Sequence, residues 1–109
     1  MRRVVDASAY EELEAAVARA LVAEIRSALE QAGLSGTALQ STVASVASSV
    51  ADIYDGAAHV EGGEDYVSPI LGFAIGRMRN RLLLPEEGGS SIHEFVPGAV
   101  RAEFESGGA

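Results

Sequence analysis

The chain has 109 residues, of which 48% are apolar and 22% are charged, enough for one hydrophobic core and too few for two. All eight basic residues are arginines and there is no cysteine, which excludes lysine Schiff-base chemistry, phosphate-loop lysines, thiol nucleophiles and disulfides. The formal net charge of −8 disfavours contact with a nucleic-acid backbone, so we expect no nucleic-acid partner.

The sequence contains no stretch that predicts a targeting signal or a membrane span. The longest charge-free run, residues 31–51, is rich in Ser, Thr and Gly, whereas a bilayer span needs about 20 mostly apolar residues. Acidic residues soon after Arg2 and Arg3 interrupt the apolar region that a secretory leader needs. We therefore expect a cytoplasmic protein with no membrane partner.

Residues 8–33 are predicted to form a long helix. Ser8 and Glu11 have the spacing of a capping box, and Asp6 is a competing N-cap. Apolar residues then recur three and four positions apart, on one face of a helix, and Gly33 is a typical C-terminal stop. This apolar stripe consists of Tyr10, Leu13, Val17, Leu21, Ile25 and Leu29.

Residues 37–55 are predicted to form a second helix, which begins at a capping box of Thr37 and Gln40. The connection over residues 33–36 is short, which favours an antiparallel pair with the first helix. The predicted buried seam steps by four and three residues through Leu39, Val43, Val46, Val50, Ile53 and Ala57.

The flanks of this second helix are made of small, uncharged residues, although a surface helix normally carries charges on its outer face. Three interpretations are open: the chain's own C-terminal half covers the helix, a second copy binds it, or it is an exposed serine-rich surface. The candidate interaction face consists of Ser41, Ala44, Ser45, Ser48 and Ser49.

The segment 70–84 lies between two acidic, glycine-rich loops, and its pattern fits both a helix and a strand. Ser68 as a cap and Pro69 at the first helical position favour a third helix. The alternation from Arg77 to Arg81 is typical of a strand instead. The length of the segment and its Ser–Pro start lead us to predict the helix.

The predicted fold is therefore all-α, with three main helices and a short helical C-terminal segment. The first two helices form a helical hairpin and the third closes the core. Residues 1–105 make a single helical domain, and residues 106–109 are a flexible tail.

The first candidate site is a metal site formed by Asp52, Asp55 and His59. If the second helix extends to His59, the three side chains lie within about 60° of one another around its axis, and two carboxylates with an imidazole can bind a divalent metal. Both aspartates also lie where the helix dipole disfavours negative charge, which is sometimes a sign of function. If Gly56 ends the helix, all three are solvated end groups.

The second candidate site is the basic segment that contains Arg77, Arg79 and Arg81. A guanidinium group matches both phosphate and carboxylate, so these residues are candidates for contact with an anion or a protein partner. The alternative is internal pairing with the acidic residues that bracket the segment, which are Glu61, Glu64, Asp65, Glu86 and Glu87.

The sequence contains no catalytic constellation and implies no cofactor, so we favour a protein that is not an enzyme. The leading hypothesis is an interaction or regulatory module that acts as a homodimer or binds another protein. A metal-dependent hydrolase or metal-binding protein is the first alternative, and it rests on the candidate metal site. The second is an acidic, immunity-type inhibitor of a basic target, which the net charge permits.

Overall fold

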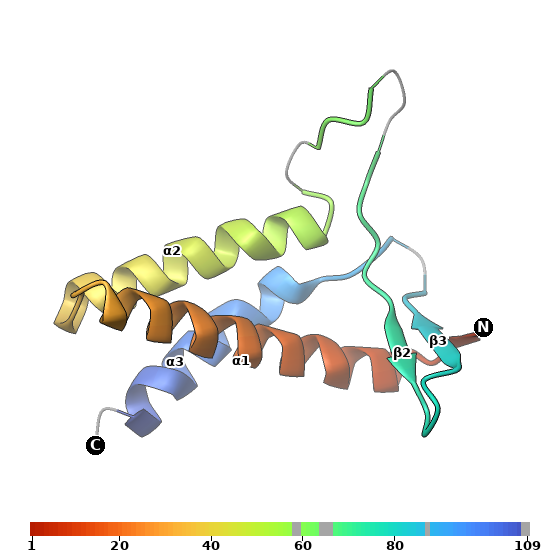
Figure 1. Ribbon diagram of the computed structural model, residues 1–109, viewed down its shortest axis with the longest axis horizontal. Coiled ribbons are helices and arrows are strands. Elements are labelled where there is room, and N and C mark those ends of the chain that lie inside the picture. Colours follow the sequence, from red (N-terminus) through yellow and green to blue (C-terminus); the bar gives the residue numbers. More distant parts are fainter. Residues whose placement is uncertain (58–59, 64–66, 87, 108–109) are drawn as a thin grey trace.

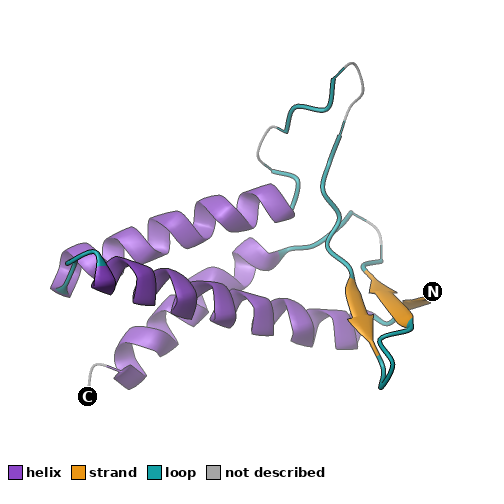
Figure 2. Ribbon diagram, in the orientation of Figure 1, coloured by secondary structure: helices purple, strands orange, loops and turns teal. Residues whose placement is uncertain are grey.

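The computed structural model describes residues 1–57, 60–63, 67–86 and 88–107. The elements in chain order are β1 (Arg2–Val5), α1 (Ala7–Gln31), α2 (Gly36–Tyr54), β2 (Phe73–Ile75), β3 (Arg81–Leu84), the 3-10 turn η1 (Ile92–Phe95) and α3 (Val96–Gly107). The described residues thus form an α+β fold, with a helical layer and a small sheet at one end (Figure 2). The predicted all-α class is therefore wrong.

The two long predicted helices are present as α1 and α2, and they lie side by side in opposite directions (Figure 1). The N-cap of α1 is Asp6 and not Ser8, because the Asp6 carboxylate accepts a first-turn backbone N–H at 3.1 Å. At the other end Gly33 has a φ of +100°, and the N–H of Leu34 donates to the carbonyl oxygen of Leu29 at 3.0 Å. This is the predicted glycine stop, and it turns the chain into α2.

The face of α2 that enters the core differs from the predicted seam. Its buried residues recur every four positions and are Leu39, Val43, Ala47 and Ala51. By contrast, Val46 is 38% exposed and Ile53 is 47% exposed. Two of the four buried side chains are alanines, so the backbone of α2 packs close to its neighbours while the larger residues stay at the flank.

The predicted third helix over residues 70–84 is a β-hairpin. Strand β2 pairs antiparallel with β3, and the unpredicted strand β1 pairs with the other edge of β3 in parallel, giving the order β1-β3-β2. The reversal uses Gly76 at a φ of +90° and Arg79 at a φ of +52°. Both conformations are left-handed and incompatible with a right-handed helix, so the strand alternative that the sequence left open is the one adopted.

Contacts of Tyr10 attach this sheet to the helices. Its ring packs edge-on against Phe73 with centroids 5.3 Å apart, and its hydroxyl donates to the carbonyl oxygen of Leu71 at 2.6 Å. Leu83 in the central strand is buried at the same junction. The sheet is therefore fixed at the N-terminal end of α1.

The C-terminal segment begins between α1 and α2, crosses behind α1 in the view of Figure 1, and completes the core through contacts with both helices. The chain enters η1 and continues without a break into α3. The buried residues that this segment contributes are Ile92, Val96, Ala99 and Val100. The third helix that closes the core is thus this one, and it extends to residue 107, into the predicted tail.

Candidate functional site

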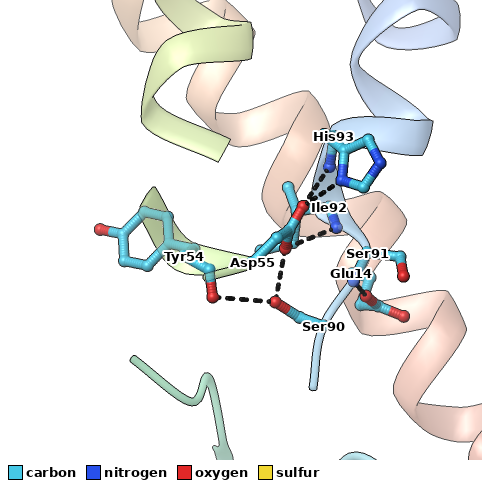
Figure 3. Close-up of polar contacts among 7 residues, drawn as sticks. All are labelled: Glu14, Tyr54, Asp55, Ser90, Ser91, Ile92 and His93. Atoms are coloured by element: carbon cyan, nitrogen blue, oxygen red, sulfur yellow. Dashed lines mark hydrogen bonds and ion pairs between the residues drawn. The ribbon is translucent and has the colours of Figure 1, made fainter. Parts of the chain in front are cut away.

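A connected group of polar contacts lies where the end of α2 meets the start of η1 (Figure 3). Asp55 directly follows α2, and its side chain is only 2% exposed. Its Oδ1 accepts hydrogen bonds from the Ser90 hydroxyl at 2.5 Å and from the Ile92 N–H at 2.9 Å. Its Oδ2 accepts from the backbone N–H of His93 at 2.8 Å and from Nδ1 of the same residue at 2.6 Å.

Glu14 of α1 supplies a second carboxylate to the same place. It is buried, and its Oε2 accepts the backbone N–H of Ser91 (Figure 3). Three consecutive N–H groups at the entry to η1 therefore donate to carboxylates from two other helices. The first N–H groups of a helix lack partners within it and carry partial positive charge, which negative groups stabilise. We call this group of Glu14, Asp55, Ser90, Ser91 and His93 the carboxylate cluster.

Burial and hydrogen bonding act in opposite directions on the two carboxyl groups. Burial raises the pKa of Asp55, but the hydrogen bonds that it accepts outweigh burial, and its pKa lies below the ordinary value of 3.8. Burial raises the pKa of Glu14 above 4.5, and neighbouring carboxylates add to this effect against the bond from Ser91. The hydrogen bond to Asp55 raises the pKa of His93 above 6.5. Asp55 and protonated His93 therefore stabilise each other as an ion pair.

The arrangement of Asp55 and His93 is that of a carboxylate orienting an imidazole, but the rest of a hydrolytic triad does not follow. In such a triad the second ring nitrogen accepts from the nucleophilic hydroxyl. Here the single hydrogen of the Ser90 hydroxyl is directed to Asp55 at 2.5 Å, with the carbonyl oxygen of Tyr54 as a longer second acceptor at 3.2 Å. No hydrogen bond between His93 and a hydroxyl group is found in the described part of the chain. The hydrogen bonds of the cluster instead join α1, the end of α2 and the start of η1.

A pocket of about 210 Å³ opens beside the cluster, between α1 and the start of η1. Acidic residues dominate its polar lining, which includes Glu11, Glu14, Glu86 and Glu94. The nearby carboxylates Glu11 and Glu94 contribute to the raised pKa of Glu14. A site for phosphate or carboxylate needs positively charged or hydrogen-bond-donating groups, so this acidic lining disfavours both ligands.

The three residues of the predicted metal site do not come together as one ligand set. Both oxygens of Asp55 accept hydrogen bonds, Asp52 is half-buried one turn earlier, and His59 lies outside the described residues. Across the described ranges, no group of three or more His, Asp or Glu side chains has the arrangement of a metal site.

Sequence reasoning did not find Glu14, Ser90 or Ser91, and the apolar stripe that it predicted for this helix ran through Leu13 and Val17 instead of Glu14. The buried stripe of α1 repeats every four residues as Tyr10, Glu14, Ala18 and Val22, so a carboxylate occupies a core position. The sequence did carry a signal for Asp55, which is its unfavourable placement as a negative charge at a helix C-terminus. It is explained by Asp55 capping the following helical segment.

The candidate interaction face is only partly covered in the single chain. Ser41, Ser45 and Ser49 are exposed, whereas Ala44 and Ser48 are half-buried at the edge of the core. The chain's own C-terminal half packs on the opposite side of α2, against residues such as Val43 and Ala47. Exposed Val46 and Ile53 lie on the same outer side of the helix as the three exposed serines, at 100° per residue.

The predicted basic segment lies at the turn of the β-hairpin. Arg77 and Arg79 are exposed in the turn, and Arg81 begins β3. Of the acidic partners that the sequence offered, Glu64, Asp65 and Glu87 lie outside the described residues, and Glu86 makes no ion pair with these arginines within the described ranges. Strand β1 adds Arg2 and Arg3 to the same end of the sheet.

Comparison with protein-family models, curated proteins and solved structures finds no match to this chain. Within the described ranges, no helix has the length and apolar character needed to cross a membrane.

Proposed function

We propose that this protein is a non-catalytic interaction module that forms a homodimer through the outer face of α2. We define this α2 outer face as Ser41, Ser45, Val46, Ser49 and Ile53, all of them exposed. The observation that supports the proposal is that a long surface helix exposes apolar side chains among small hydroxyls and carries no charge from Gly36 to Ala51. Surface helices of isolated proteins normally carry charges on that side.

The charge of the molecule favours this face over the rest of the surface for self-association. Two copies with a net charge of −8 repel each other, and a two-fold interface brings equivalent patches face to face. Any uncompensated charge within such a patch therefore lies close to the same charge on the second copy. The α2 outer face avoids this penalty, and its serines permit close approach while Val46 and Ile53 supply apolar contact.

The position of Asp52 favours an antiparallel pairing of the two helices. It is the first charged residue of α2 and lies one turn beyond Ser48. In an antiparallel pair centred near residue 47, the two Asp52 carboxylates are separated by about 15 Å along the axis. This exceeds the Debye length of about 8 Å at physiological salt, so their repulsion is largely screened.

The test is the solution mass of the protein across roughly 1 to 100 µM by sedimentation equilibrium. We expect a monomer–dimer equilibrium that Ser45→Arg or Ser49→Arg shifts to monomer, with a loss of affinity of roughly tenfold or more. The matched control is Ser27→Arg, the same substitution at an exposed position of α1. A monomeric mass over the whole range, or equal effects of the control and the α2 variants, would refute the proposal.

A further inference from the structure

The parallel pairing of β1 with β3 collects arginines that lie far apart in the sequence. Arg2 is the register partner of Arg81, and Arg3 is the partner of Leu82. The N–H of Arg2 also donates to the carbonyl oxygen of Asn80 at 3.2 Å, which joins the start of β1 to the hairpin turn. The N-terminal segment and the hairpin turn therefore form one end of the sheet (Figure 1). We call Arg2, Arg3, Arg77, Arg79 and Arg81, together with Met78, the basic tip.

The basic tip divides the charge of the molecule into two regions of opposite sign. Residues 1–5 and 67–84 contain five arginines and no acidic residue. The rest of the chain has three arginines against 16 acidic residues, a balance of −13. Arg26 on the helical body pairs with Glu30 and Glu103, whereas no ion pair between described residues includes an arginine of the tip. The guanidinium groups of the tip are thus available to an external anion.

An exposed apolar side chain lies between two of these arginines in the sequence. Met78 is 80% exposed, and it lies at the turn between Arg77 and Arg79. The left-handed backbone at Gly76 and Arg79 makes this turn tight. Met1, which precedes Arg2 at this end of the sheet, is 76% exposed. An exposed methionine among arginines matches a surface that offers both anionic and apolar groups.

We propose that the basic tip docks onto the surface of a bilayer that contains anionic phospholipid. Its arginines bind lipid phosphates, and Met78 enters the boundary between headgroups and acyl chains. This docking needs no membrane-spanning segment, the criterion on which the sequence-based expectation of no membrane partner rested. A nucleic acid is the less suitable polyanion, because the tip offers an exposed methionine where base contacts need stacking or hydrogen-bonding side chains.

The shape of the molecule keeps its acidic body away from such a surface. The principal extents are 44 × 38 × 21 Å, and the sheet lies at one end of the longest axis (Figure 1). Charges more than about 8 Å from the lipid are largely screened at physiological salt. End-on docking therefore brings the arginines within range and leaves most of the carboxylates outside it.

The experiment is co-sedimentation of the full chain with vesicles, at about 0.1 M salt, of phosphatidylcholine alone or with about a third phosphatidylglycerol. We expect binding to the anionic vesicles only, and loss of that binding at about 0.5 M salt. Arg77→Gln with Arg79→Gln should lower the partition coefficient roughly 10- to 30-fold. Met78→Ser should lower it several-fold, and Met78→Leu should restore it, since the contribution of Met78 is apolar.

The matched control is Arg19→Gln with Arg101→Gln, which removes the same charge from exposed positions on the helical body. Circular dichroism of each variant confirms that it is folded. Equal loss of binding in the control pair, or no binding of the wild type to anionic vesicles, would overturn the proposal. Binding of a labelled DNA duplex in place of the vesicles would also overturn it, in favour of a nucleic-acid partner.

Discussion

His93 contacts the Asp55 carboxylate twice, through its backbone N–H at 2.8 Å and through Nδ1 of its ring at 2.6 Å, and both donate to Oδ2. The two residues are 38 positions apart and belong to different helical segments. A single buried oxygen therefore joins the end of α2 to the start of η1. Part of the stability of the fold should therefore depend on this junction.

Replacing Asp55 should be among the most destabilising single changes outside the apolar core. Asp55→Ala leaves the donors of Ser90, Ile92 and His93 without their acceptor, and we expect a loss of about 3 kcal/mol in the free energy of unfolding. Urea denaturation measures it. Asp52→Ala is the control, since Asp52 is half-buried on the same helix, and a change within about 0.5 kcal/mol is expected there. Equal losses in the two variants would contradict this role.

The His93–Asp55 pair should make stability depend on pH in the neutral range. The pKa of His93 is raised in the folded state, so its contribution is fully present below 6.5 and is lost as pH rises through the folded-state pKa. In His93→Gln this decrease should be absent. Denaturation midpoints measured from about pH 5 to 9 provide the test. A direct NMR titration of the His93 ring in wild type and in Asp55→Asn should show the pKa falling in the variant.

At acid pH, protonation of the two carboxylates of the cluster should change the free energy of unfolding in opposite directions. The pKa of Asp55 is lowered, so its contribution is present above 3.8 and is lost as pH falls through its folded-state pKa. The pKa of Glu14 is raised, so its contribution is present below 4.5 and is lost as pH rises through its folded-state pKa.

Glu14→Gln should therefore gain stability relative to wild type as pH rises from about 4 to 7, because the variant keeps an acceptor for Ser91 and removes a buried charge. Glu14→Ala removes the acceptor and should cost about 2 kcal/mol at neutral pH. Parallel urea curves for both variants test this. A glutamine variant as unstable as the alanine variant would show that the charge itself is required.

Loss of the Tyr10 hydroxyl should loosen the attachment of the sheet. Tyr10→Phe keeps the edge-on ring contact with Phe73 and removes the bond to the Leu71 carbonyl, at a cost of about 1 kcal/mol. Amide hydrogen exchange should accelerate in β2 and β3 more than in α2. Tyr54→Phe, at a partly exposed position, serves as the control. Uniform acceleration throughout the chain would argue against a local role.

Added magnesium, manganese or zinc should leave the melting temperature unchanged. A metal on Asp55 must displace hydrogen bonds that hold the carboxylate at the entry to η1, so binding there opposes folding. A ligand that binds only the native state raises the melting temperature with its concentration. A concentration-dependent rise that Asp55→Asn abolishes would restore the metal-site hypothesis.

The local sequence predicts the two long helices because their signals lie within a few residues of one another. The apolar period, the cap candidates near Asp6 and the stop at Gly33 all act within one or two helical turns. The small, uncharged flanks of α2 could also be read from the sequence, but the exposure of Ser41, Ser45 and Ser49 could not. Which face of α2 enters the core could not, because that depends on how closely its alanines approach the neighbouring helices.

The sheet and the polar cluster depend on contacts between distant residues. Strand β1 is four residues long, and its partners, β3 and the preceding Asn80, lie far along the chain, so no local pattern distinguishes it from a loop. Asp55 looks unfavourable within its own helix and becomes favourable only when η1 is placed against it. Local periodicity thus determined α1 and α2. Only the tertiary structure decided the sheet, the basic tip and the carboxylate cluster, because each of them is assembled from residues that lie far apart in the sequence.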